Sequence, residues 1–564
     1  MNHNHNQNES AINFNEAVDV VVIGSGGAGL TAALSAAKSG AKVLVLEKSS
    51  KLGGNTSISG GQVWVPNNHH MLAKGILDSE EAARAYLEKV IDGATSKDVI
   101  DVFIKTAPET IQYIEENTPL RFHSMTKFPD YRQEFPGSVQ GGRTLDPDPI
   151  AAEIVGEWAD LIHEGPHFSA VTYEENSKWN AFAYPENIDF DLIAERLAND
   201  IRTLGAAIIV GLVKGCLDSD VHFEVNAAAN RLLKDKNRIT GVEVTINGKK
   251  QLIEARKGVV IASGGFEFNE ELTNRFLRGP INGPIGVPTN TGDGLKMALD
   301  VGADVAHLNE AWWCPTMKID DEEFEDTQVF RLSRGERSLP GSILVNRAGK
   351  RFVNEAANYN DMARAFHVFD PTKYEYSNMP SWIIFDGRFR SKYSVMTLMP
   401  GDPDPDWLFC ANTLQELAEK VGIDGDQLTK TVERFNQFAI EGKDPDFHRG
   451  ESKYDSYYGD PRNKPNAGLG PIDQGPFYAL PVYSGTLGTK GGAVTNASAQ
   501  VLNVWGEPIQ GLYAAGNAAA SMMGPGYPGA GGTLGPALTF GYIAGLHASS
   551  IVKPNTDGVN AIRS

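Results

Sequence analysis

The chain has 564 residues, a length that corresponds to about three to four domain-sized units, so a peptide or a small single module is excluded. Its 71 acidic and 51 basic residues give a net charge of −20, which disfavours binding to nucleic acid or to anionic lipid head groups. No apolar run approaches the roughly 18 residues of a membrane span, and Cys216, Cys314 and Cys410 lack the spacing of a metal site or disulfide framework. We therefore expect a cytoplasmic protein with no transmembrane segment, no metal site and no nucleic-acid partner.

The first predicted elements follow a polar stretch, residues 1–16, which we expect to be a disordered tail. An apolar run at 18–23 then meets a glycine cluster, a small-residue stretch with helical period and a second apolar run at 41–48. This order of strand, turn, helix and strand predicts a βαβ unit and therefore a parallel sheet. The same strand-to-glycine pattern returns at 256–267 and at 511–517, which predicts that the chain comes back to this sheet twice.

The middle of the chain differs in composition, with more aromatic, acidic and proline residues and few βαβ signals. We interpret residues 309–484 as an inserted α+β catalytic domain, and residues 17–308 with 485–564 as an α/β, Rossmann-like domain built from both chain ends. Two stretches with few regular signals, at about 150–190 and 316–336, are candidates for lids or surface insertions.

The first motif reads G-x-G-x-x-G where the first predicted strand ends and a helix begins. Gly24 permits the tight turn, Gly26 lets backbone N–H groups approach a pyrophosphate, and Gly29 lets the helix pack on the strand. Gly27 and Ala28 complete the motif, whose phosphates would lie at the helix N-terminus. Glu47 follows 18 residues after Gly29, where a carboxylate accepts hydrogen bonds from ribose hydroxyls. This combination predicts a dinucleotide site.

Two further glycine groups distinguish a flavin from a nicotinamide. The stretch 53–61 reads GGNTSISGG and begins a few residues after Glu47, as though the chain follows an extended cofactor. Gly516 and Asn517 end another predicted strand, of the kind that would contact the ribityl-pyrophosphate. Together these features favour FAD over NAD.

In this order of motifs the sequence resembles the flavoprotein family that contains fumarate reductases and 3-ketosteroid dehydrogenases. The resemblance covers most of residues 17–550 and implies an FAD domain interrupted by a catalytic domain. It also implies a set of cofactor contacts beyond the first motif and Glu47: Lys48, Gly54, Asn55, Thr56, Gly60, Gly61, Gly264, Asp293, Gly516, Asn517 and Leu534. Because no histidine or cysteine lies in the glycine-rich segments, we expect FAD to be bound non-covalently.

The glycine-rich segment 522–537 indicates the branch of the family. Fumarate reductases carry an arginine there that binds the dicarboxylate, and this chain has none. The segment instead resembles the 3-ketosteroid 1-dehydrogenase pattern, in which a tyrosine and a glycine four residues later bind the C3 carbonyl of the substrate. Those positions are Tyr527 and Gly531.

Two more elements resemble this branch, and each ends on a tyrosine. Residues 128–131 read F-P-D-Y and residues 354–359 read N-E-A-A-N-Y, which places Tyr131 and Tyr359 in the positions that the family uses.

Dehydrogenation of two adjacent saturated carbons requires a hydride acceptor, a base and a group that acidifies the C–H bond. Flavin N5 is the acceptor, while Tyr527 and the backbone N–H of Gly531 would polarise the carbonyl as an oxyanion hole does. Tyr359 would be the base, as a phenolate. An ordinary tyrosine pKa near 10 leaves it protonated at neutral pH, so we expect a hydrogen bond from Tyr131 to lower that pKa.

The predicted activity is therefore FAD-dependent introduction of a C1–C2 double bond into a 3-ketosteroid such as 4-androstene-3,17-dione, with an external electron acceptor. The alternatives are a 3-ketosteroid 4(5α)-dehydrogenase, a fumarate-reductase-like flavoprotein acting on another substrate, and a flavin-binding protein without turnover.

Overall fold

The computed structural model describes residues 14–166 and 170–550. The larger of its two main sheets holds β1 (Glu16–Ile23), which lies between β2 and β11 and pairs in parallel with both. All but one residue from Val18 to Ile23 are fully buried, as expected for a central strand covered on both faces. The strands run in the order β23 (Gln500–Leu502), β24 (Pro508–Ala514), β10 (Arg238–Ile246), β11 (Lys249–Ile261), β1, β2 (Val43–Leu46) and β8 (His222–Glu224), and β9 (Ala227–Asp235) pairs with β10.

This sheet confirms the predicted α/β fold assembled from both chain ends. β24, from the end of the chain, pairs in parallel with β11, which in turn pairs in parallel with β1. The predicted returns at 256–267 and 511–517 therefore both join the sheet. Most of the predicted tail, residues 1–13, lies outside the described residues, but Asn15 already donates from its backbone to Leu252 at 2.8 Å and Glu16 begins β1.

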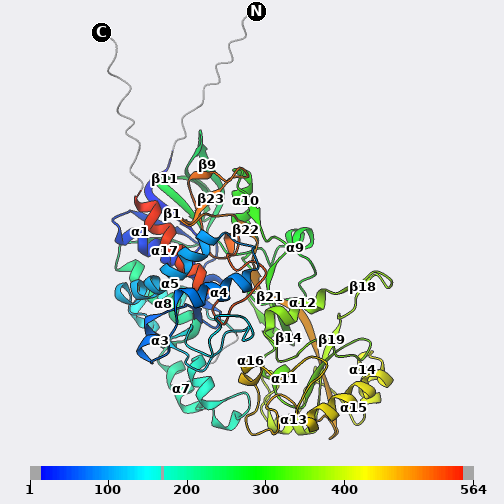
Figure 1. Ribbon diagram of the computed structural model, residues 1–564. Helices are drawn as coiled ribbons and strands as arrows, with labels where there is room; N and C mark the ends of the chain where they lie inside the picture. The colour runs from blue at the N-terminus through cyan, green and yellow to red at the C-terminus, as the bar shows by residue number, and fades with distance from the viewer. Residues whose placement is uncertain (1–13, 167–169, 551–564) are drawn as a thin grey trace, which may run out of the picture.

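Helices cover one face of this sheet, where α1 (Gly27–Lys38) and α17 (Leu534–Ser550) lie side by side (Figure 1). A Cβ on Gly541 would lie 2.3 Å from the carbonyl oxygen of Ala28, and one on Gly545 would lie 2.1 Å from that of Ala32. The small residues of α17 therefore permit the close approach of the two helices. The layer also contains α4 (Glu80–Ile91), α5 (Lys97–Asn117) and α8 (Leu204–Leu217).

The second sheet lies at the opposite end of the molecule, with α13, α14 and α15 around it (Figure 1). Its main strands are antiparallel and run in the order β15 (Thr327–Leu332), β14 (Ala311–Phe324), β21 (Phe477–Thr489), β19 (Ser381–Asp386) and β16 (Ser342–Asn346), while β12 (Gly283–Pro284) and β20 (Phe409–Ala411) pair with β21. Its helices are α11 (Gly335–Ser338), α12 (Tyr359–Arg364), α13 (Gly387–Lys392), α14 (Leu414–Val421), α15 (Gly425–Glu441) and α16 (Lys453–Tyr457).

Most of this sheet falls within residues 309–484, although β21 continues across the predicted boundary to Thr489. The exact domain limits remain a prediction. The stretch at 316–336 is largely regular, because β14 and β15 form a hairpin with Thr316 opposite Leu332. The stretch at 150–190 contains a 3₁₀ segment, η1 (Ala152–Leu161), whose Trp158 packs against the core and contacts the ring of Phe223 at 5.2 Å.

The remaining elements connect these layers. One small sheet, β3 (Val63–Trp64), β5 (Thr144–Pro147) and β4 (Phe122–Ser124), carries Trp64 beside the glycine-rich segment 522–537. The others are β6 (Ile150–Ala151), β7 (Ile201–Arg202), β13 (Val305–Ala306), β17 (Phe369–Asp370), β18 (Glu375–Tyr376), β22 (Gly492–Ala493), α2 (Gly54–Ser57), α3 (His69–Ala73), α6 (Tyr173–Trp179), α7 (Phe190–Ala198), α9 (Glu270–Phe276), α10 (Asp293–Asp300), and the 3₁₀ turns Pro185–Asn187, Ala365–His367 and Gly516–Ala518. No helix in the described part of the chain combines the length and apolarity needed to cross a bilayer.

Candidate active site

A cavity of about 340 Å³ runs from the glycine-rich end of the large sheet to the β14–β15 hairpin of the second sheet. Every predicted cofactor residue lines it except Gly29. Gly29 instead packs the helix on the strand, as its place in the motif predicts, because a Cβ there would lie 2.1 Å from the carbonyl oxygen of Gly24. The motifs that the sequence spreads over some 500 positions thus meet around one cavity.

Glu47 lies at the end of β2, where the motif places the ribose-binding carboxylate. Its Oε2 accepts hydrogen bonds from the backbone N and the hydroxyl of Ser25, at 3.1 and 2.7 Å, and its Oε1 accepts from the backbone N of Ser49 at 2.8 Å. These bonds hold a buried carboxylate beside the glycine turn and fix its orientation.

The other polar residues of the predicted cofactor set are held in place by one another. Lys48 Nζ donates to Asp293 Oδ2 at 2.6 Å, and Thr56 Oγ1 accepts from the backbone N of Gly27 at 3.0 Å. Asn55 bridges to the second half of the chain, because its Nδ2 donates to the carbonyl oxygen of Leu487 at 3.1 Å. These contacts fix the positions of the cofactor residues relative to one another.

The lining also offers groups that a bound dinucleotide would satisfy. Ser263 Oγ and Gln62 Nε2 are buried, line the cavity and have no hydrogen-bond partner among the described residues. The backbone of the motif is open at Gly26. A Cβ added there would lie 3.7 Å from Thr56 Oγ1 and 3.8 Å from the carbonyl oxygen of Gly53, so a ligand can approach. These unsatisfied donors and the open glycine turn fit FAD.

The three predicted tyrosines come together from three separate parts of the chain. The ring centroids of Tyr131 and Tyr359 lie 5.7 Å apart, those of Tyr131 and Tyr527 5.3 Å, and those of Tyr359 and Tyr527 5.4 Å. Tyr359, Tyr527 and Gly531 line the cavity, while Tyr131 lies behind them and contacts both of the other rings.

The hydroxyl groups of the cluster form a chain. Tyr131 donates to Tyr359 and lowers its pKa, as the sequence predicts, but burial outweighs this bond and raises the pKa of Tyr359 well above the ordinary tyrosine value. Tyr359 donates to Tyr527, whose own hydroxyl lies 3.1 Å from Thr533 Oγ1. With its pKa raised in this way, Tyr359 carries its proton at neutral pH.

Tyr131 is held by the F-P-D-Y element and its neighbours. Its backbone N donates to the carbonyl oxygen of Pro528 at 3.0 Å, which ties it to the segment that carries Tyr527. The preceding residue, Asp130, accepts from Trp64 Nε1 and from Arg143 Nη1, both at 2.8 Å. Burial raises the pKa of Asp130 to about 6 even though Arg143 lowers it. The element thus fixes a backbone rather than supplying a second catalytic acid.

Tyr359 is the first residue of α12, and the N-E-A-A-N-Y element positions this helix. Asn358 caps it by accepting from the backbone N of Asp361 at 3.0 Å. Glu355 is fully buried and accepts two hydrogen bonds from Arg351, both at 2.7 Å, and one from Arg449 at 3.2 Å. Burial raises and the Arg351 charge lowers the pKa of Glu355, and the net shift is downward.

Gly531 has φ +90, a conformation that favours glycine. A Cβ there would lie 2.4 Å from the backbone N of Trp64 and 2.6 Å from the backbone of Gln62. The glycine is therefore required by the close approach of β3, in addition to any room it leaves for a substrate.

The sequence analysis did not identify Lys490, whose side chain contacts the backbone of the segment that carries Tyr527. Its Nζ donates to the carbonyl oxygens of Pro525 and Gly526, at 3.1 and 2.7 Å, and lies 4.2 Å from the ring of Trp312. Burial lowers the pKa of Lys490 to about 7. No motif marks this lysine in the sequence.

The sequence analysis also did not identify the cavity residues that come from the second sheet and from the region after α6. They come from the β14–β15 hairpin, from α11 and from two loops, and no motif identifies them: Phe182, Met317, Arg331, Leu332, Arg334, Glu336 and Met396.

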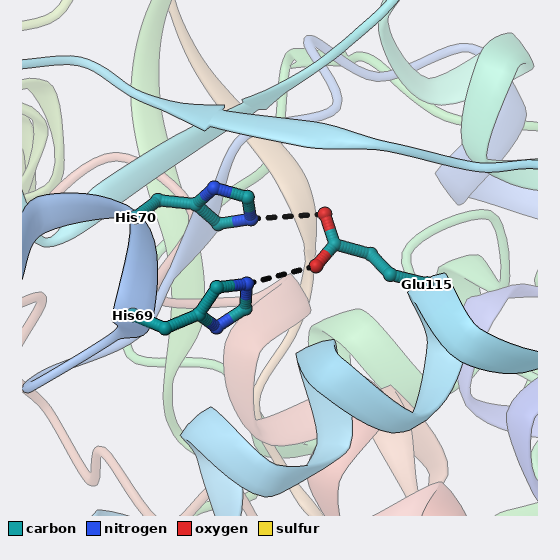
Figure 2. Close-up of side chains that lie close together, drawn as sticks. All are labelled: His69, His70 and Glu115. Atoms are coloured by element: carbon teal, nitrogen blue, oxygen red, sulfur yellow. Dashed lines mark hydrogen bonds and ion pairs between the residues drawn. The ribbon is translucent and has the colours of Figure 1, made fainter. Parts of the chain in front are cut away.

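His69 and His70, which follow the predicted cofactor loop in the sequence, both face Glu115. Figure 2 shows the imidazoles of His69 and His70 directed at Glu115. His69 Nε2 lies 2.9 Å from Oε2 of Glu115 and His70 Nε2 lies 2.9 Å from Oε1, so each ring faces its own carboxylate oxygen. No histidine or cysteine lines the cavity within the described residues, and non-covalent binding of FAD stays a prediction.

Comparison with known proteins fits this geometry. The family model described as "FAD binding domain" matches residues 19–534. The chain belongs to this FAD-binding family. FAD is its cofactor.

Individual relatives cover nearly the whole chain. A 4-oxocyclohexanecarboxylate 2-dehydrogenase of Sinomonas cyclohexanicum is 41% identical over 551 residues, which are 96% of this chain and 95% of the relative. A 3-oxosteroid 1-dehydrogenase of Mycobacterium tuberculosis is 40% identical over 560 residues, 94% of this chain and 98% of the relative. The solved 3-ketosteroid Δ1-dehydrogenase of Sterolibacterium denitrificans, in complex with 1,4-androstadiene-3,17-dione, matches with a TM-score of 0.89 and 36% identity over 95% of this chain and 99% of that one.

Proposed function

We propose that this chain is an FAD-dependent 3-ketosteroid 1-dehydrogenase, which introduces a double bond between C1 and C2 of the A ring. The observation that carries the proposal is the cluster of Tyr131, Tyr359 and Tyr527. Two of these tyrosines, Tyr359 and Tyr527, line the cavity together with Gly531. The relatives described above support it, since both the 3-oxosteroid 1-dehydrogenase and the structural neighbour carry this activity in their names.

In this proposal Tyr527 and Gly531 bind the substrate carbonyl. The Tyr527 hydroxyl and the Gly531 backbone N–H donate to the C3 oxygen and stabilise the negative charge that develops there, so the C2 hydrogens become more acidic. Lys490 holds the backbone that carries Tyr527, through the carbonyl oxygens of Pro525 and Gly526. FAD, when bound, supplies the acceptor for the hydride from C1.

Tyr359 takes the C2 proton on its hydroxyl oxygen. It can do so only as a phenolate, and the bond donated by Tyr131 stabilises that charged form. Substrate binding also gives the Tyr527 hydroxyl a second possible acceptor, the C3 oxygen, besides Thr533 Oγ1. The reduced cofactor must then be reoxidised, so the cycle needs an external electron acceptor, and we expect it to run in the cytoplasm.

A 5α-saturated 3-ketosteroid tests the regiochemistry, because both the C1–C2 and the C4–C5 bonds of its A ring can be oxidised. Holoenzyme is incubated with this steroid and an artificial electron acceptor, and the new double bond is located by NMR. A C1–C2 alkene supports the proposal. A C4–C5 alkene would instead indicate a 4(5α)-dehydrogenase, and no product from this or any other 3-ketosteroid would leave only a flavin-binding protein or a reductase of another substrate.

A further inference from the structure

His69, His70 and Glu115 form a cluster of metal-ligating side chains outside the cavity of the candidate active site. The two histidines begin α3, and Glu115 lies in the last turn of α5. Figure 2 shows both imidazole rings on the same side of the carboxylate, with their Nε2 atoms directed at it. One ligand atom of each residue lies within 4.8 Å of those of the other two. Ligand atoms from two helices therefore converge on one point.

The hydrogen bonds of the cluster identify which atoms face this point. Nε2 of His69 lies 2.9 Å from one carboxylate oxygen of Glu115, and Nε2 of His70 lies 2.9 Å from the other. An ionised carboxylate only accepts hydrogen bonds, so each Nε2 donates a proton to it. A metal ion replaces such protons, because a neutral imidazole binds metal through the ring nitrogen without a proton and keeps its proton on the other nitrogen.

The spacing of these atoms suits a small tetrahedral ion. Zn²⁺ holds imidazole nitrogen and carboxylate oxygen at about 2.0 to 2.2 Å, so two of its tetrahedral ligands lie about 3.4 Å apart. Each Nε2 and its carboxylate oxygen, now 2.9 Å apart, would have to separate by about 0.5 Å. The side chain of His69 is 44% exposed and has room for this adjustment. Three protein ligands leave the fourth tetrahedral position to water.

Hydrogen bonds also hold the backbone and the carboxylate of the cluster in place. Asn68 is buried and caps α3, since its Oδ1 accepts from the backbone N of Met71 at 2.8 Å and its Nδ2 donates to the carbonyl oxygen of Gly142 at 3.0 Å. On the other side of the cluster, Oε1 of Glu115 accepts from the backbone N of Phe122 at 2.9 Å. Contacts of this kind orient the ligands of metal sites.

The donor set indicates the class of ion. Two imidazole nitrogens and one carboxylate suit Zn²⁺ and related transition-metal ions, whereas Mg²⁺ and Ca²⁺ take oxygen ligands. The net charge of −20 on the chain attracts cations to its surface. The sequence alone did not indicate this site, because Glu115 lies 45 positions from His70 and only the fold brings them together.

We propose that His69, His70 and Glu115 bind one Zn²⁺ ion, which connects α3 with the end of α5. None of the three residues lines the active-site cavity, so this ion is structural and takes no part in dehydrogenation. The three ligands meet only in the folded chain, and the ion therefore stabilises the folded state. The site is independent of the proposed function.

Zinc uptake by the metal-depleted holoenzyme tests the site. Calorimetric titration with ZnCl₂ should show binding with which Mg²⁺ and Ca²⁺ do not compete. His69→Gln and Glu115→Gln should each weaken it at least 10- to 100-fold, since loss of even an outer contact of a metal site has that effect. Glu115→Gln keeps an oxygen that can accept from the backbone N of Phe122. His222→Gln is the matched control, because it removes an exposed histidine that pairs with Glu224 at 3.1 Å, and it should bind zinc like the wild type.

Two further measurements distinguish this site from zinc bound elsewhere. ZnCl₂ should raise the midpoint of thermal unfolding in the wild type and in His222→Gln but not in His69→Gln, and X-ray absorption at the zinc edge should show two imidazole ligands. No zinc uptake by the wild type, or equal affinity in the wild type, His69→Gln and Glu115→Gln, would overturn the proposal. Zinc uptake that is lost in the double variant His3→Gln/His5→Gln and kept in His69→Gln would also overturn it. None of these results depends on steroid turnover.

Discussion

Replacement of Tyr359 by phenylalanine removes one oxygen from the cluster and keeps the ring. The ring contacts with Tyr131 and Tyr527, at centroid distances of 5.7 and 5.4 Å, would remain, so folding and FAD content should survive. Only the group proposed to accept the C2 proton is lost. Because a positioned general base contributes roughly 10² to 10⁴ in rate, kcat should fall by that factor.

The same reasoning sets the pH dependence of the wild type. Burial raises the pKa of Tyr359 above the ordinary tyrosine value, so the phenolate fraction at pH 7 is on the order of 10⁻³ or less. The active form therefore increases about tenfold for each pH unit as pH rises toward that pKa, and log kcat should rise with pH over the neutral and mildly alkaline range. Tyr359→Phe should lose this rise together with the rate.

Exchange of the C2 hydrogens with D₂O measures the base directly. The holoenzyme is reduced beforehand, so that its flavin cannot take up hydride, and steroid exchange is followed by mass spectrometry. Wild type should exchange and Tyr359→Phe should not. Tyr454→Phe is the matched control: it removes another buried hydroxyl, from a ring whose centroid lies 4.7 Å from that of Tyr131, and it should exchange like the wild type. Wild-type exchange in Tyr359→Phe would refute the assignment of Tyr359 as the base.

Three other variants test the surrounding contacts. Tyr131→Phe removes the bond that lowers the pKa of Tyr359, so the rise of kcat with pH should move to higher pH, and an unchanged pH–rate profile would contradict that role. Glu47→Ala should weaken FAD retention by about 1.5 to 3 kcal/mol, measured by titrating apoprotein with FAD, and wild-type affinity would exclude a direct contact. Burial lowers the pKa of Lys490 from 10.5 to about 7, so the folded state binds fewer protons than the unfolded state between these values and stability rises with pH there. Urea unfolding at pH 7 and pH 10 should show a gain of up to about 4 kcal/mol in wild type relative to Lys490→Met, and equal pH dependence of the two would refute the shift.

The parts of the fold that the sequence predicts are those with a local cause. The strand β1, the glycine turn and α1 follow from an apolar run, a steric requirement at Gly24 and Gly29, and a helical period. The two later returns of the chain to this sheet, at 256–267 and 511–517, follow from repeated strand-to-glycine patterns. The hairpin at 316–336 was not predicted, because the acidic residues of β14, such as Asp320 and Asp321, hide the alternation that marks a strand.

The site divides in the same way. The glycines and tyrosines could be predicted since each stands in a motif with its own spacing. Lys490 and Arg334 could not be predicted, because their positions in the site depend on which segments pack against them. Lys490 is identified only by its hydrogen bonds to the carbonyl oxygens of Pro525 and Gly526. Arg334 is identified only by its place in the lining of the cavity. The raised pKa of Tyr359 likewise depends on burial among rings that are far apart in the sequence.

The central claim is that this chain oxidises a 3-ketosteroid with its own FAD. Anaerobic mixing of the oxidised holoenzyme with 4-androstene-3,17-dione tests it most directly. Because no second electron acceptor is present, each flavin is reduced once, and its absorbance reports that single turnover. The account predicts that the visible flavin bands bleach with formation of one equivalent of the 1,4-diene product. A flavin spectrum that stays oxidised after addition of excess steroid, with no diene formed, would contradict it.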